Sequence, residues 1–161
     1  MTIGFIAMGI LFWKQIPIQM SDQRRLLLLV LGAFIYFPGV SLYLWGLVTI
    51  WSQFGVSSLL GADLYTGHQL ITWGPYGIIR HPMYMGIILA AIGGLLIFQT
   101  WAMVVFLPMA LMVISRTGCE EKLLEKEFGN EWQAYISKVP SWFPKFLPID
   151  NMPGSNRMTK G

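Results

Sequence analysis

Residues 26–51, LLLLVLGAFIYFPGVSLYLWGLVTIW, run for 26 positions without one charged side chain. A helix needs about 20 mostly apolar residues to cross a bilayer core roughly 30 Å thick, so this run is long enough to span it. The rest of the chain has the same character. Of 161 residues, 55% are hydrophobic and 12% are charged, about half the charged share of a soluble domain. The sequence therefore predicts an integral membrane protein.

Three more apolar runs are expected to be helical. Residues 1–13 are short for a span unless the helix continues to Met20. Residues 82–98 and 101–115 are separated only by Gln99 and Thr100, which predicts a tight antiparallel hairpin. The expected fold class is an all-α integral membrane protein with four to five transmembrane helices, including this C-terminal hairpin. No G-x-G-x-x-G run is present, so we expect no Rossmann domain.

The chain is expected to form a single domain, residues 1–161, with four parts. These are N-terminal membrane helices (1–51), a connector (52–80), the helical hairpin (81–118), and a C-terminal amphipathic helix with a cap (119–145). The connector has five glycines and too few apolar residues to span a membrane. The amphipathic helix is predicted from about 119 to 138, because apolar residues recur at helical spacing with charged residues between them.

The distribution of positive charge predicts an orientation. If the three longer runs span, the connector and the C-terminus share a side that carries eight Lys and Arg residues, against three on the other side. Positive residues favour the cytosolic face, so we expect an active site that faces the cytosol. Because these residues form no continuous stripe, no nucleic-acid partner is expected. The single cysteine, Cys119, excludes an internal disulfide and a multi-cysteine metal site, so no metal is predicted.

Two polar stretches lie at the open end of the predicted hairpin. They are GPYGIIRHPMYMG (74–86) and SRTGCEE (115–121), and the fold-back should bring Arg80 and His81 near Arg116 and Glu120. Ionisable groups near membrane depth usually pair or line a functional cavity. A purely structural reading is also open: Arg80 could reach lipid head groups, and the acidic pair could lie in the first turn of a helix. Adjacent helical residues point about 100° apart, so only one of the two glutamates should face a given ligand.

Together these stretches resemble the C-terminal signature of the isoprenylcysteine carboxyl methyltransferase family. Its elements are G-x-Y, then R-H-P-x-Y-x-G, then E-E-x-x-L-x-x-x-F-G-x-E-[YW]-x-x-Y-x-x-x-V-P. Here they fall at Gly74 and Tyr76, at 80–86, and at 120–140. The resemblance covers about residues 61–145, and phosphatidylethanolamine N-methyltransferases share a looser version of it.

The resemblance implies a methyl donor, S-adenosylmethionine, with S-adenosylhomocysteine as the product. Arg116 matches an arginine that faces the methyl acceptor, and we take it as the catalytic and substrate-binding residue. The residues that match the family's donor contacts are His68, Gln69, Leu70, Ile71, Tyr76, His81 and Glu120.

The chemistry of the donor agrees with these residue types. Its carboxylate suits His81 and its ammonium suits Glu120, because charge-assisted hydrogen bonds are the strong ones. Leu70 and Ile71 could form an apolar slot for adenine. The sulfonium is a cation that could lie against Tyr84 or Tyr76, so Tyr84 joins the predicted donor contacts.

The expected acceptor is lipophilic and enters from the bilayer, most simply as the C-terminal carboxylate of an isoprenylcysteine-type substrate held by Arg116. Attack by a carboxylate needs no general base, whereas an amine would repel Arg116. The alternatives are a phospholipid (ethanolamine) N-methyltransferase, an NADPH-dependent membrane reductase of sterol reductase type, and a non-catalytic protein that keeps the fold. Beyond membrane lipids, the sequence indicates no partner, and it leaves the oligomeric state open.

Overall fold

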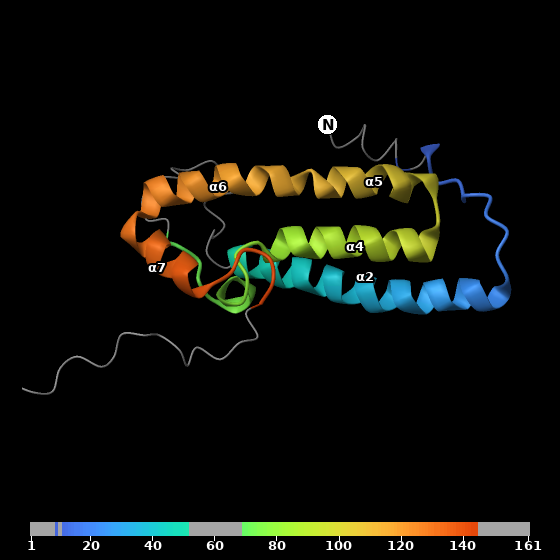
Figure 1. Cartoon of the computed structure of the whole chain (residues 1–161), viewed down its shortest axis with the longest axis horizontal. Coiled ribbons are helices and arrows are strands. Elements are labelled where there is room, and N and C mark those ends of the chain that lie inside the picture. The colour runs from blue at the N-terminus through green and yellow to red at the C-terminus, as the bar shows by residue number, and fades with distance from the viewer. Residues whose placement is uncertain (1–8, 10, 52–68, 145–161) are drawn as a thin grey trace, which may run out of the picture.

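The computed structural model describes residue 9, residues 11–51 and residues 69–144. Within these ranges the chain is helical and forms no strand; the β-type pairing is one isolated bridge between Gln15 and Thr100. The elements are α2 (Asp22–Trp51), a short 3-10 helix η1 (Gly74–Gly77), α4 (Pro82–Phe98), α5 (Trp101–Leu111), α6 (Val113–Phe128) and α7 (Asn130–Lys138). Helix α4 lies between α2 and the nearly continuous α5 and α6, and α7 folds across one end (Figure 1).

Helices α2 and α4 pack closely along a line of glycines, and this is the most extensive contact between elements of the described chain. On α2, Gly32, Gly39 and Gly46 are buried at intervals of seven residues. A Cβ atom built on Gly86 of α4 would lie 2.7 Å from the carbonyl oxygen of Gly39. Small residues of this kind let two helix backbones meet directly. They fix how α4 presents its other faces.

The two-residue connection between α4 and α5 is reinforced by the N-terminal segment. Ile16 donates its amide hydrogen to the Gln99 carbonyl at 2.8 Å, and Trp101 donates to the Lys14 carbonyl at 3.1 Å. Residues 13–20 are not helical, so a first helix does not continue to Met20. These residues use their backbone groups to pair with the turn. The prediction for residues 1–8 lies outside the described residues.

The predicted helix over residues 82–98 is confirmed with those bounds, but the next boundary is not where the sequence placed it. The amphipathic stretch does not begin a separate helix at Cys119, because α6 starts at Val113 and follows α5 with only Met112 between them. Glu120 and Glu121 therefore lie in the middle of α6, and the first-turn reading of this acidic pair is wrong. The break comes at Gly129, whose φ of +49° favours glycine, and α7 then turns away.

Two helical stretches, Asp22–Trp51 and Trp101–Phe128, are long and apolar enough to cross a membrane, and Pro82–Phe98 is a shorter apolar helix. Only 11% of the apolar window in each long stretch is buried, which separates them from the core helices of a soluble protein. Large apolar side chains such as Phe34, Phe37 and Val48 are exposed on α2. The chain is therefore described as a membrane protein. The number of spans, and a hairpin that crosses the membrane, stay predictions.

Candidate functional site

A cavity of about 420 Å³ lies where η1, the start of α4, the middle of α6 and the start of α7 meet. This size is in the range of sites for small molecules and cofactors, roughly 300–1,000 Å³. Seven of the nine predicted site residues line it, and they come from three separate stretches of chain. They are Gln69, Leu70, Ile71, Tyr76, His81, Tyr84 and Glu120.

The apolar side of the cavity is built by α7 and the end of the connector. Trp132 and Tyr135 are buried at 3% and 7% exposure, and Leu70 packs against this cluster together with Phe128 of α6. The Tyr135 hydroxyl donates a hydrogen bond to the Tyr76 carbonyl oxygen at 2.7 Å, which ties α7 to η1. This packing brings Leu70 and Ile71 to the cavity beside Tyr76.

Burial perturbs both tyrosines of this wall. It raises the pKa of Tyr135 to about 12, and it raises the pKa of Tyr76 well above its ordinary value. Both phenols therefore keep their protons at neutral pH, and Tyr135 remains a hydrogen-bond donor.

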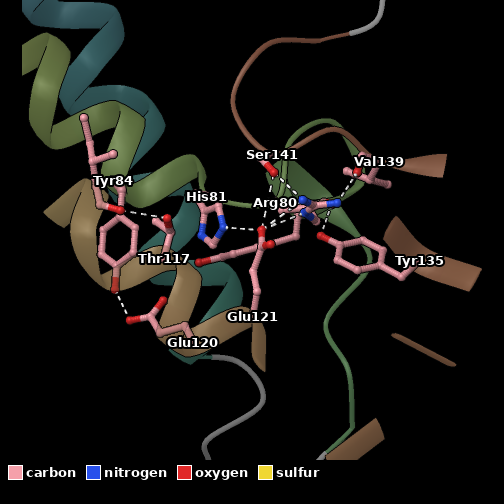
Figure 2. A network of polar contacts seen from close by, with 11 residues as sticks. Arg80, His81, Tyr84, Thr117, Glu120, Glu121, Tyr135, Val139 and Ser141 are labelled. Carbon is pink, nitrogen blue, oxygen red and sulfur yellow. Dashed lines mark hydrogen bonds and ion pairs between the residues drawn. The ribbon is translucent and has the colours of Figure 1, made fainter. Parts of the chain in front are cut away.

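A charged network joins the start of α4 to α6 (Figure 2). The Glu121 Oε1 atom lies 2.9 Å from an Arg80 guanidinium nitrogen and 2.9 Å from His81 Nε2. The Arg80 guanidinium also stands 5.8 Å from the ring centroid of Trp132, within the range of a cation–π contact. Arg80 thus lies inside the protein, and the reading that sends it to lipid head groups is wrong.

The charge state of Glu121 follows from these partners. Its side chain lies beyond the apolar part of the helix, which ends at Ser115. Burial alone would raise the pKa of Glu121, but the hydrogen bond from His81 and the Arg80 guanidinium together hold the pKa below its ordinary value. Glu121 is therefore a carboxylate with its partners inside the protein.

Glu120 is engaged quite differently. Its carboxylate lines the cavity and accepts a hydrogen bond from the Tyr84 hydroxyl across the gap between α6 and α4 (Figure 2). The two neighbouring glutamates therefore point to different places, as the 100° helical step predicts. Glu121 binds the protein's own cations, and Glu120 is the carboxylate that faces the cavity.

Arg116 lies on α6, one turn before Glu120, with an exposed side chain. It is not among the residues that line the cavity. His68, the ninth predicted site residue, lies outside the described residues.

The sequence reasoning missed several residues of the cavity wall. Leu124 and Phe128 follow Glu120 at intervals of four residues, so they share its face of α6 and line the cavity with it. That spacing was a usable signal. Trp132 lies four residues after Phe128, but the turn at Gly129 breaks the helical phase before it, so this spacing does not explain why Trp132 lines the cavity.

Comparison with known proteins gives a family. The family model described as phospholipid methyltransferase matches residues 28–131, more than half of the chain. The match begins within α2 and ends at the start of α7, so it contains most of the cavity wall.

Individual relatives match over a shorter stretch. A protein-S-isoprenylcysteine O-methyltransferase of Schizosaccharomyces pombe is 29% identical over 90 residues, 55% of this chain and 38% of the relative. A probable protein-S-isoprenylcysteine O-methyltransferase of Oryza sativa subsp. indica is 35% identical over 79 residues, 48% of this chain and 41% of the relative. A Delta(14)-sterol reductase of Mus musculus is 34% identical over 80 residues, 47% of this chain but 19% of the relative. The chain thus matches about two fifths of the length of the methyltransferase relatives.

Proposed function

Because this chain belongs to the phospholipid methyltransferase family, we propose that it is a membrane methyltransferase that uses S-adenosylmethionine. The acceptor that we propose is the carboxylate of an isoprenylcysteine-type molecule, which the names of the relatives from fission yeast and rice support. One observation carries the proposal. Residues far apart in the chain, Glu120, His81 and Leu70, line a single cavity of about 420 Å³ at one end of the helices.

The residues of the cavity fit the chemistry of the donor. Glu120 offers a carboxylate to the donor ammonium, and His81 offers a ring nitrogen to the donor carboxylate. The apolar wall at Leu70 and Ile71 suits adenine. A cavity with an acidic group, a histidine and an apolar slot is what this amphiphilic cation requires.

Positioning accounts for the proposed catalysis. S-adenosylmethionine supplies an electrophilic methyl group on a sulfonium sulfur, and transfer to a carboxylate oxygen breaks the methyl–sulfur bond without any proton transfer. The protein needs only to align the two reactants and exclude water. Arg116 lies one helical turn before Glu120, with an exposed side chain outside the donor cavity, and in this proposal its guanidinium holds the acceptor carboxylate by two hydrogen bonds.

Calorimetry with the detergent-solubilised full chain tests the donor. We expect S-adenosylhomocysteine to bind with 1:1 stoichiometry and NADPH not to bind. Binding of NADPH alone would support the reductase alternative, for which the mouse sterol reductase similarity is the relevant observation. Binding of neither ligand would favour a non-catalytic role.

Transfer of a labelled methyl group tests the acceptor. A farnesylcysteine analogue should be methylated faster than phosphatidylethanolamine, because Arg116 attracts a carboxylate and repels an amine. Arg116→Ala should lower turnover at least tenfold and leave the affinity for S-adenosylhomocysteine unchanged, with Lys122→Ala as the control for an exposed cation on the same helix. Loss of donor affinity in Arg116→Ala, or a preference for the amine, would contradict the acceptor proposal.

A further inference from the structure

The residues that follow α7 return to the site from outside the cavity. We call residues 139–142 the C-terminal strap. No residue of the strap lines the cavity described above. Val139 lines a separate groove beside α7. The strap is nevertheless hydrogen-bonded to the two residues that precede α4. The Arg80 amide donates to the Pro140 carbonyl at 2.9 Å, and the His81 amide donates to the Ser141 carbonyl at 3.2 Å.

The Arg80 and Glu121 side chains fasten the strap a second time. Arg80 donates to the Val139 carbonyl at 3.3 Å and also to the Ser141 hydroxyl. The Ser141 hydroxyl in turn contacts Glu121 Oε1 at 3.3 Å. A single carboxylate oxygen on α6 therefore joins the start of α4 to the strap (Figure 2). Breaking one partner of such a network is costly because the others lose their charge balance.

The strap and its fastening enclose the ring of His81. Trp142 lies against the imidazole with ring centroids 5.6 Å apart, and Tyr84 stacks on it at 5.8 Å with 13° between the planes. The Nε2 atom is held by Glu121 at 2.9 Å, and the residue is only 7% exposed. Because Nε2 already has a partner, Nδ1 is the ring nitrogen left to meet a ligand, and it donates to a carboxylate when the ring carries a proton on both nitrogens.

We propose that the C-terminal strap, locked by Arg80 and Glu121, positions His81 for the methyl donor, and that Trp142 and Glu121 are positioning residues. Trp142 does not line the cavity, so it acts through the imidazole. The inference rests on the proposed function, in which His81 holds the donor carboxylate. A ring held in advance saves the cost of ordering it on binding, and releasing the ring should weaken binding without disturbing the helices.

Substitutions of two neighbouring aromatic residues test the strap. Trp142→Ala in the full chain should weaken S-adenosylhomocysteine binding about tenfold by calorimetry, while helical circular dichroism and Tm stay within error of the wild type. Trp142→Phe should restore most of the affinity, because a ring still covers the imidazole. Phe143→Ala is the matched control. Because the Phe143 side chain is 75% exposed, this variant should bind the ligand as the wild type does.

A second pair of variants tests the lock. Glu121→Gln keeps the shape of the side chain and removes the charge that holds Arg80 and His81, so it should weaken S-adenosylhomocysteine binding about tenfold. Glu125→Gln makes the same change on an exposed part of the same helix and should not. In turnover assays, Trp142→Ala and Glu121→Gln should raise KM for the donor and spare kcat and the KM of the acceptor.

The outcomes separate the strap from the proposed function. If the wild type fails to bind S-adenosylhomocysteine, the proposed function falls. If the wild type binds it and His81→Ala does not, but Trp142→Ala and Glu121→Gln bind as tightly as the wild type, only the strap inference falls. Parallel losses of Tm and affinity in Trp142→Ala, or an equal loss in Phe143→Ala, would reduce the strap to a folding element and overturn the inference.

Discussion

The two sides of α4 make contacts of opposite kinds. Towards α2, glycines bring the two backbones together, and Gly86 leaves no room for a Cβ atom. Towards α6, polar side chains reach across a gap, as Tyr84 does to Glu120 and His81 does to Glu121. The first contact is continuous and apolar, whereas the second is sparse, polar and beside a cavity.

This difference teaches how a small membrane protein can hold a precise site. The close α2–α4 contact fixes α4 as a platform, because a backbone contact allows little sliding. The polar part of the site then needs only a few side chains at α4 and α6, beside a cavity that stays open for a ligand. Three of the four predictions below break one contact or the other, and the fourth concerns the cavity wall that α7 adds.

The largest effect is expected where the α2–α4 contact is filled. Gly86→Leu would force a Cβ atom to 2.7 Å from both the Gly39 carbonyl oxygen and the Tyr43 amide nitrogen. Leucine is a better helix former than glycine, so any loss comes from packing. We expect the free energy of unfolding in detergent to fall by about 3 kcal/mol or more.

The control is the same substitution on α6. A Cβ atom on Gly118 would meet nothing within 4 Å, so Gly118→Leu should leave Tm unchanged or raise it slightly. Equal loss of Tm in the two variants would show that the α2–α4 contact is not the platform described here.

The next effect falls on the polar side. Glu120→Ala removes the carboxylate that faces the cavity, and we expect S-adenosylhomocysteine affinity to drop about a hundredfold, or roughly 2.7 kcal/mol. The helices should persist, because the substitution removes a single hydrogen bond between α4 and α6, the one from the Tyr84 hydroxyl to this carboxylate. Glu125→Ala on the same helix is the control. A variant that binds as the wild type would move the donor ammonium away from Glu120.

The sequence predicted the side chains of this site better than the elements that carry them. Spacing and residue types were enough to predict that His81 and Glu120 lie near one another and that Glu120 and Glu121 point in different directions. The start of the amphipathic helix was misplaced, because the change from apolar to charged residues near Ser115 marks a change of surroundings and not a helix end. Whether a helix continues depends on the backbone angles φ and ψ of each residue, and α6 keeps helical angles until Gly129.

Contacts between segments far apart in the chain could not be predicted from the sequence. Nothing in the stretch around Gly86 shows that α2 is the helix on which it packs. Likewise, Arg80 could have faced lipid, since nothing in its own stretch shows that residues 139–141 return to it. Tertiary contacts of this kind depend on chain reversals that hydrophobic periodicity does not encode.

A smaller effect is expected for the bridge across the gap. Tyr84→Phe removes the hydroxyl that orients the Glu120 carboxylate, so S-adenosylhomocysteine affinity should fall about fivefold, measured by calorimetry. Tyr36→Phe, on the α2 side, removes a hydroxyl far from the cavity wall and is the control. Tighter binding by Tyr84→Phe would mean that the tyrosine competes with the donor for Glu120 and does not orient it.

The smallest effect concerns the wall that α7 adds to the cavity. Tyr135→Phe deletes the hydrogen bond to the Tyr76 carbonyl, and we expect about 1 kcal/mol less stability, read as a small fall in Tm. Because burial raises the pKa of Tyr135 to about 12, its phenol donates this bond at every pH up to about 11, and the difference in Tm between wild type and variant should be flat from pH 6 to 9. S-adenosylhomocysteine affinity should fall less than in Tyr84→Phe, since the buried aromatic ring still packs beside Trp132 and keeps α7 in place. A difference in Tm that disappeared within this pH range would show that the hydroxyl ionises below even its ordinary pKa, so that the Arg80 charge and not burial governs it.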